Sequence, residues 1–198
     1  MLTQFESLCK VKEMKKAAMP TIPPSWADFP DIELYMDQVI SVLEKHLSPY
    51  FEEKCITSTM INNYVKQKLI SPPQNKRYTR GQLARLFMIC ILKSFMQLSD
   101  VSALLDELGK TRSEEETYSL FATDLEQSLL SVFGGAKPSQ EPSAPVENAL
   151  HTALTAFAAI LYARQSFRRA AAELIPPVTE ETKEKKKKEE KPDKKKKD

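Results

Sequence analysis

Amide, hydroxyl and cationic side chains gather in one stretch of the sequence, "TSTMINNYVKQK", which begins at Thr57 and ends at Lys68. Asn and Gln amides can hydrogen-bond the edges of DNA bases, hydroxyl groups can bind bases or phosphates, and a Lys ammonium neutralises phosphate. The next stretch, "SPPQNKRYT", adds two adjacent cations behind a proline pair. These residues suggest recognition of duplex DNA. The candidate contacts are Thr57, Ser58, Thr59, Asn62, Asn63, Lys66, Lys76 and Arg77.

The charge distribution favours an anionic ligand. The chain has 198 residues, with 29 Lys and Arg against 27 Asp and Glu, so it is nearly neutral. A basic segment without acids is typical of a nucleic-acid site, and it adds Arg80 to the candidates. The alternative is a helical protein–protein adaptor whose basic face meets an acidic partner and binds no DNA. From residue 54 to residue 93 there is no Asp or Glu, and the bases are Lys54, Lys66, Lys68, Lys76, Arg77, Arg80, Arg85 and Lys93.

Helices are expected to position these side chains. The spacing of apolar residues predicts one helix over about residues 31–47 and a second over residues 57–68. The Thr57 hydroxyl is expected to cap the second helix, because Thr is favoured at that position. Thr79 and Gln82 form a capping-box pattern, which predicts the start of a third helix. The segment between the second and third helices would then be a rigid, basic loop.

Two more helices are expected after the third. One is predicted from Ser99, its expected cap, to Leu108, with Gly109 as the stop. The next begins with a second capping box, Ser113 to Glu116, and ends at Gly134-Gly135. With four Gly and few strand-type runs in the whole chain, these patterns predict an all-α fold.

Composition divides the chain into segments. The prolines from Pro20 to Pro30 should keep an N-terminal arm extended, with Trp26 and Phe29 pinning it to the body. The Lys/Glu-rich end has too few large apolar residues to fold and is expected to be disordered. The expected segments are an arm (1–30), a helix-turn-helix domain (31–110), a helix (111–133), a linker (134–145), a C-terminal helix (146–175) and the tail (176–198).

The long Ala-rich C-terminal helix has three interpretations. Its apolar face could pair with the same helix of a second chain, could cover the body of its own chain, or could help to line a pocket for an effector within residues 113–174. Helix-turn-helix proteins commonly bind two half-sites, which favours a homodimer. The sequence leaves these alternatives open.

Enzymatic and metal chemistry have little support. There is no Gly-rich phosphate loop, no nucleophile elbow and no base near a candidate nucleophile, so we expect no enzyme activity and no cofactor. The three cysteines, Cys9, Cys55 and Cys90, are too far apart for a zinc-ligand spacing and are expected to be reduced structural thiols. His46 and His151 are isolated and are expected at the surface or as capping residues. The longest apolar run is too short to span a membrane.

The order of residues in this region carries a resemblance to a known family. Tyr64, Leu69, Ile70, Pro72, Arg77, Tyr78 and Leu83 resemble the helix–wing–helix segment of MerR-type regulators. The resemblance implies a winged helix-turn-helix with a recognition helix at 57–68 and a wing at 72–78. It also implies that Tyr64 and Arg77 contact phosphates and adds Tyr78 to the candidates. MerR-type proteins usually have Gly where Lys68 stands.

A second resemblance covers more of the chain. The block from Pro30 to about Leu108 looks like a Gram-positive bacterial family that is catalogued as a domain of unknown function. This likeness implies a cytoplasmic bacterial protein. The acid-free segment combined with the ordered motif leads us to expect a sequence-specific DNA-binding transcriptional regulator, with repression as the expected mode.

Overall fold

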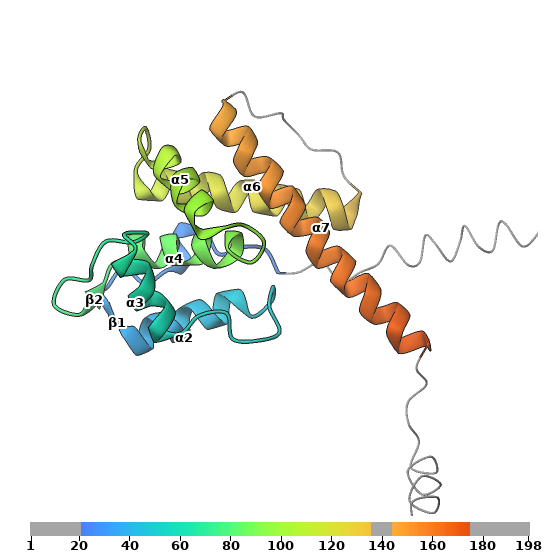
Figure 1. Cartoon of the computed structure of the whole chain (residues 1–198), viewed down its shortest axis with the longest axis horizontal. Coiled ribbons are helices and arrows are strands. Elements are labelled where there is room, and N and C mark those ends of the chain that lie inside the picture. The colour runs from blue at the N-terminus through green and yellow to red at the C-terminus, as the bar shows by residue number, and fades with distance from the viewer. Residues whose placement is uncertain (1–20, 136–143, 175–198) are drawn as a thin grey trace, which may run out of the picture. The chain divides into compact units, whose positions relative to one another are not determined.

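The computed structural model describes residues 21–135 and 144–174, and these residues are mostly helical (Figure 1). The helical class predicted from the sequence is therefore confirmed. The described residues up to Tyr162 belong to one compact unit, and those from Ala163 onward belong to a second. The elements are η1 (Trp26–Asp28), β1 (Leu34–Tyr35), α2 (Met36–Leu47), α3 (Ser58–Lys66), β2 (Arg77–Tyr78), α4 (Arg80–Leu92), α5 (Leu98–Gly109), α6 (Glu114–Gly134) and α7 (Pro145–Leu174).

Three of the predicted helix starts are confirmed by side-chain caps. The Thr57 hydroxyl accepts a hydrogen bond from the Met60 amide at 3.2 Å. Both capping boxes form, at the starts of α4 and α6. α6 ends as expected at Gly135, whose φ of +68° lies in the left-handed region that glycine favours. These signals succeed because each involves residues only three or four positions apart.

The predicted cap of α5 is wrong. The helix begins at Leu98, so Ser99 lies inside it, and its N-cap residue Gln97 makes no side-chain capping bond. The extended arm also needs correction. Trp26–Asp28 form a short 3-10 helix, because the prolines lie on either side of these residues and leave them free to turn.

A two-stranded antiparallel ribbon was not predicted. Leu34 pairs with Tyr78, and Tyr35 pairs with Arg77. The pairing removes the first residues of the expected 31–47 helix, which therefore starts only at Met36. Alternation along the strands buries Leu34 and Tyr78 and exposes Tyr35 and Arg77. The ribbon thus joins the start of α2 to the end of the basic loop.

α4 is the central element of the core. Every residue from Gly81 to Leu92 is buried except Arg85. α2 and α6 pack against it, and Figure 1 shows α4 between them. Phe29 is fully buried, with its ring centroid 5.1 Å from that of Tyr118 and 6.2 Å from that of Phe87. The Tyr118 hydroxyl donates to the Pro24 carbonyl at 2.7 Å, so the arm is pinned to the body as expected.

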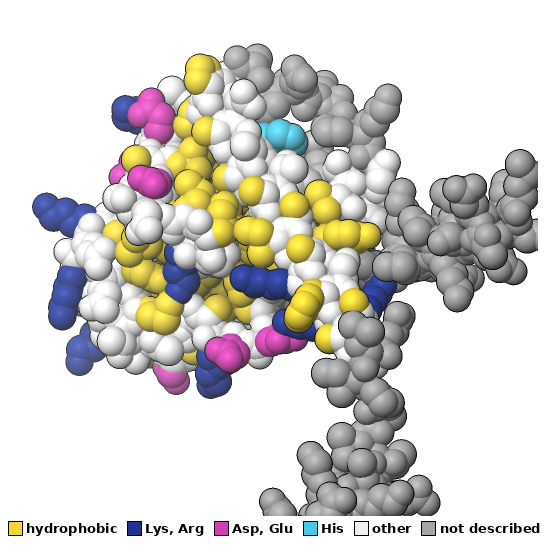
Figure 2. Space-filling model, turned by 45° about the vertical axis from the view of Figure 1, so that its right-hand side comes forward, with side chains coloured by type: hydrophobic (Ala, Val, Ile, Leu, Met, Phe, Trp, Pro, Cys, Tyr) yellow, Lys and Arg dark blue, Asp and Glu magenta, His cyan; other side chains and the backbone are white. Residues whose placement is uncertain are grey.

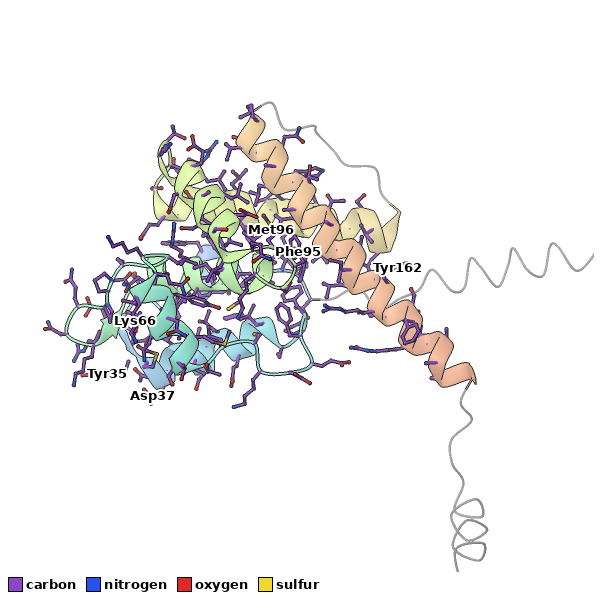
Figure 3. All side chains as sticks on the ribbon, in the orientation of Figure 1. Tyr35, Asp37, Lys66, Phe95, Met96 and Tyr162 are labelled. Carbon is purple, nitrogen blue, oxygen red and sulfur yellow. The ribbon has the colours of Figure 1, made fainter. Side chains whose placement is uncertain are left out.

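The first half of α7 covers its own chain. Leu150, Leu154 and Phe157 are fully buried. The Phe157 ring stacks on that of Phe95 at 6.0 Å, and Figure 3 labels Phe95 beside this helix. This face is therefore closed to the same face of a second chain. Residues 1–20, most of the expected linker and the expected tail lie outside the described residues.

The two histidines, expected at the surface or as capping residues, are both partly buried. The His46 ring lies 5.5 Å from that of Phe29, and burial lowers the pKa of this histidine. His151 bonds through Nδ1 to an Asp124 carboxylate oxygen at 2.6 Å, joining α7 to α6.

Candidate nucleic-acid interface

α3 presents a polar face to solvent because its apolar residues recur at helical spacing. Ile61 and Tyr64 are buried, and Met60 and Val65 are half-buried. This leaves a surface of hydroxyl, amide and ammonium groups beside the amide groups of the first turn, which attract anions. The exposed candidates are Thr57, Ser58, Thr59, Asn62, Asn63 and Lys66. Asn62 and Asn63 are both exposed, but successive helical residues point about 100° apart, so the two side chains cannot face the same part of a bound ligand.

A left-handed residue ends α3. Lys68 has φ of +61°, and the next amide, that of Leu69, donates to the Tyr64 carbonyl at 2.9 Å. This is the geometry of a helix C-terminus that glycine favours, and it is the position where MerR-type proteins usually have Gly. Leu69 and Ile70 then return to the core, which fixes the exit of the chain from the helix.

Residues 71–77 form a structured basic loop with a tight turn at its tip. Asn75 and Lys76 have φ of +48° and +63°, and the Arg77 amide donates to the Gln74 carbonyl at 2.8 Å. Two consecutive left-handed residues inside such a bond define a type I′ turn, which matches the twist of a hairpin. The turn places Lys76 at the exposed tip.

Gln82 fixes the base of this loop. Its side-chain amide donates to the Ser71 carbonyl at 2.8 Å, while its amide oxygen accepts from the Thr79 amide at 2.8 Å. One side chain therefore caps α4 and tethers the loop. The loop is positioned by the core helix and not only by its own turn.

Tyr35 orients Arg77, a role that sequence reasoning missed. The Arg77 guanidinium donates to the Tyr35 hydroxyl at 3.1 Å and lies 5.1 Å from the centre of its ring. Tyr35 is 47 % exposed and, like Lys66, lies on the side of Figure 3 that carries α3 and the loop. Only the strand register reveals this contact, because the two residues are 42 positions apart.

Half of the eight cations in the acid-free segment are exposed and have no acidic partner among the described residues. Lys66, Lys68, Lys76 and Arg77 are exposed and have no carboxylate partner in the part of the chain that the structure describes. Figure 2 shows Lys and Arg side chains along the middle and lower part of its left-hand edge. The negative charge of Glu33 contributes to raising the pKa of Arg77, but the two side chains form no ion pair. The other cations are engaged elsewhere: Lys54 with Glu44, Arg80 with Asp31, Arg85 with Asp106, and the half-buried Lys93 with the Cys55 carbonyl.

Three sequence candidates do not belong to this surface. Tyr64 and Tyr78 are 5 % and 2 % exposed, so they are core residues that support α3 and β2. Tyrosine combines an apolar ring with a polar hydroxyl, and sequence alone did not decide between core and surface. Arg80 points to the N-terminal arm, where its guanidinium lies 3.4 Å from the Asp31 carboxylate and 5.8 Å from the centre of the Trp26 ring.

The structure also bears on membrane and metal chemistry. Within residues 21–135 and 144–174, no helix combines the length and the apolar character that crossing a bilayer requires. In the same ranges, no three His, Cys, Asp or Glu side chains come together in a way that could hold a metal ion.

Comparison with known proteins places the chain in one family. Residues 24–124 match the family model described as Domain of unknown function (DUF1836), and this range is half of the chain. It contains the core helix, α3 and the basic loop. No curated protein and no solved structure matches the chain. The likeness to a family catalogued in this way is confirmed, while the likeness to MerR-type regulators stays a hypothesis. The chain belongs to the DUF1836 family.

Proposed function

We propose that this protein is a sequence-specific DNA-binding transcriptional regulator that acts as a repressor. In this proposal α3 enters the major groove, and residues 71–77 contact the phosphate backbone beside it. The observation that carries the proposal is the set of unpaired cations, Lys66, Lys68, Lys76 and Arg77, around a polar helix face without acids. Phosphate neutralisation supplies much of the affinity of such proteins.

The arrangement of elements supports assigning different roles to the helix and the loop. α3 offers Asn62 and Asn63, whose amides can bind adenine in a bidentate manner. The loop offers Lys76 at a rigid turn and Arg77 held by Tyr35. In this proposal α3, the basic loop and α4 correspond to the recognition helix, wing and following helix of a MerR-like winged helix-turn-helix. Base readout therefore belongs to α3, and positioning on the backbone belongs to the loop.

Repression of a defined operator requires more contacts than one short helix supplies. α3 has nine residues and reaches only a few base pairs. A homodimer on two half-sites about one helical turn of DNA apart would double the contacts. Because the first half of α7 is buried in its own chain, such a dimer would use another surface.

Selection of bound fragments from genomic DNA by the purified protein tests the proposal. We expect a recurring motif, with half-site spacing that reports the number of chains bound. Affinity should fall steeply as salt increases. Failure to retain any fragment, or binding that is independent of salt, would overturn the proposal.

Two substitutions separate base contacts from phosphate contacts. Asn63→Ala should cost about 1–3 kcal/mol at particular bases and relax specificity there. Arg77→Ala should weaken all sequences to a similar degree. The matched control is Lys110→Ala. Lys110 is an exposed cation just after the end of α5 and pairs with Glu107, so its replacement should not affect binding. If Asn63→Ala and Arg77→Ala both bind like the parent, α3 is not the reading helix. Capture of a protein partner that survives nuclease treatment would favour the adaptor alternative.

A further inference from the structure

A cavity of about 270 Å³ lies where α4, α5 and the start of α6 meet. Both α4 and α5 pack against α6. At roughly 30 Å³ for each water molecule, the cavity has room for about nine waters, so a ligand that fills it must be small. Most of its lining lies outside residues 113–174, the range in which the sequence allowed an effector pocket.

The buried part of the lining is apolar except for one hydroxyl group. Met88 and Leu105 line the cavity and are 3 % and 0 % exposed. Thr117 also lines it and is 4 % exposed, and its hydroxyl has no hydrogen-bond partner among the described residues. A buried polar group without a partner destabilises a protein by more than a satisfied one does. The Thr117 hydroxyl is therefore a hydrogen-bonding group that the rest of the protein leaves unused.

The more exposed part of the lining carries charges of both signs. Arg85 and Arg112 are half-buried, and the carboxylates of Asp106 and Glu114 are exposed. Two cations therefore stand against two acids, and the formal charge of the lining is zero. A ligand with balanced charges of its own suits such a surface better than an ion of one sign.

One carboxylate and one guanidinium of the lining retain unused bonding groups. Glu114 forms no ion pair among the described residues, and its carboxylate lies against Gly81, in the space that a side chain there would fill. Arg85 donates through Nε to the Leu69 carbonyl at 2.5 Å and through Nη2 to Asp106. Its Nη1 group has no partner in the part of the chain that the structure describes, although a guanidinium carries five N–H donors. The cavity thus offers both an anionic acceptor and cationic donors.

We propose that this cavity binds a small zwitterion, a free α-amino acid with an apolar side chain. The ligand's ammonium donates to the Glu114 carboxylate and to the Thr117 hydroxyl, and its carboxylate accepts from Arg85. Its side chain contacts Met88 and Leu105. An amine without a carboxylate would leave the Arg85 donors unpaired, and a carboxylate without an ammonium would be repelled by Glu114.

Arg85 connects the cavity to the end of α3. The Leu69 carbonyl that it binds directly follows Lys68, the left-handed residue that ends this helix. A carboxylate bound to the same guanidinium restricts Arg85 and so holds the exit of α3 more firmly. DNA affinity should therefore rise by about fivefold or more when the cavity is occupied. This consequence rests on the proposed function, because α3 is the proposed reading helix.

Ligand binding is tested by titration calorimetry on the full chain with L-leucine and L-methionine as probes. Two analogues of leucine each lack one charge: 3-methylbutylamine has no carboxylate, and 4-methylpentanoate has no ammonium. L-Leucine should bind at least about tenfold more tightly than either analogue, because each analogue leaves a charged group of the lining without its partner. In protein with labelled methionine methyl groups, the NMR signal of Met88, assigned with Met88→Leu, should shift as leucine saturates the chain.

Three substitutions test the assigned contacts. Glu114→Gln keeps the size of the side chain and should weaken leucine binding about tenfold. The matched control is Glu115→Gln, the next residue of α6, which is exposed and does not line the cavity, so leucine affinity should not change. Thr117→Val should weaken leucine binding about threefold or more. Its thermal stability should equal or exceed that of the parent, because the lost hydroxyl has no partner in the unliganded protein.

Three results would overturn the amino-acid site. They are no saturable binding of either probe below about 10 mM, binding of 3-methylbutylamine as tight as that of leucine, or equal losses from Glu114→Gln and Glu115→Gln. None of these measurements involves DNA.

The coupling to α3 is measured separately, as the DNA affinity of the chain with and without saturating leucine. An affinity that stays unchanged or falls would refute the coupling and leave the binding site in place. Failure to bind DNA both with and without leucine would refute the proposed function alone.

Discussion

Replacement of Lys76 by Gly should stabilise the fold and weaken DNA binding at the same time. Lys76 has φ of +63° at the second central position of a type I′ turn, where glycine is the favoured residue. An L-residue in the left-handed region costs about 1–2 kcal/mol, and glycine loses about 0.5–1 kcal/mol more backbone entropy on folding. The net gain is about 0.5–1 kcal/mol, which should raise the Tm by about 1–4 °C.

The same change removes one proposed phosphate contact. Each phosphate contact contributes about 0.9 to the slope of log affinity against log salt, so at a salt concentration of about 0.15 M its loss weakens binding about fivefold. Stability is measured by urea unfolding followed by circular dichroism, and affinity by fluorescence anisotropy on selected duplexes across a range of salt concentrations. Greater stability with lower affinity is the expected combination, because the lysine strains the left-handed backbone at this position and also makes the proposed phosphate contact.

Lys110→Gly is the matched control for the Lys76 variant. Lys110 is also exposed and lies at a helix end, but its φ is −65°, so glycine relieves no strain there. This variant should lose up to about 1 kcal/mol of stability and keep its DNA affinity. A Lys76→Gly protein that is no more stable than the parent would refute the turn geometry. Greater stability with unchanged salt dependence would remove Lys76 from the interface.

Two further predictions concern stability alone. An ideal Cβ at Gly81 would lie 1.7 Å from a carboxylate oxygen of Glu114. Gly81→Ala should therefore raise the free energy of unfolding by clearly less than the usual advantage of alanine in a helix, about 1 kcal/mol, unless Glu114→Ala removes the obstacle. A double-mutant cycle without positive coupling between the two substitutions would contradict this prediction. Burial raises the pKa of Asp124 above 3.8 despite the bond to His151, so the folded state holds this proton more tightly than the unfolded state does. The contribution of Asp124 to the free energy of unfolding is therefore largest below pH 3.8 and is lost as the pH rises through the raised pKa. As the pH rises through this window, the free energy of unfolding of the parent, measured in urea, should fall relative to that of Asp124→Asn. A difference between the two proteins that stays constant or changes in the opposite direction would show that the pKa of Asp124 is not raised.

The sequence was informative where structure depends on near neighbours. The caps at Thr57 and at Ser113 were predictable because the bonded groups are three residues apart. The ribbon was not, because Leu34 and Tyr78 meet only after the helices between them have packed. The role of Tyr35 as the partner of Arg77 follows from that register and was equally hidden. At the site, the helix and its exposed polar face were predictable from periodicity, and so was the buried side that carries Ile61 and Tyr64.

The number of cations available to DNA depends on the fold more than on the composition. The acid-free segment contains eight bases, but Glu44, Asp31 and Asp106 lie outside it and pair with three of them, and the half-buried Lys93 is held beneath α3. Four cations remain, all on the last turns of α3 and the loop. Eight phosphate contacts would give a salt slope of about −7 per chain, and four give about −3.6. We expect a measured slope near the smaller value. Asp31→Asn should leave the slope unchanged even though it removes an ion pair, because Arg80 lies beside Trp26 and away from the proposed DNA surface.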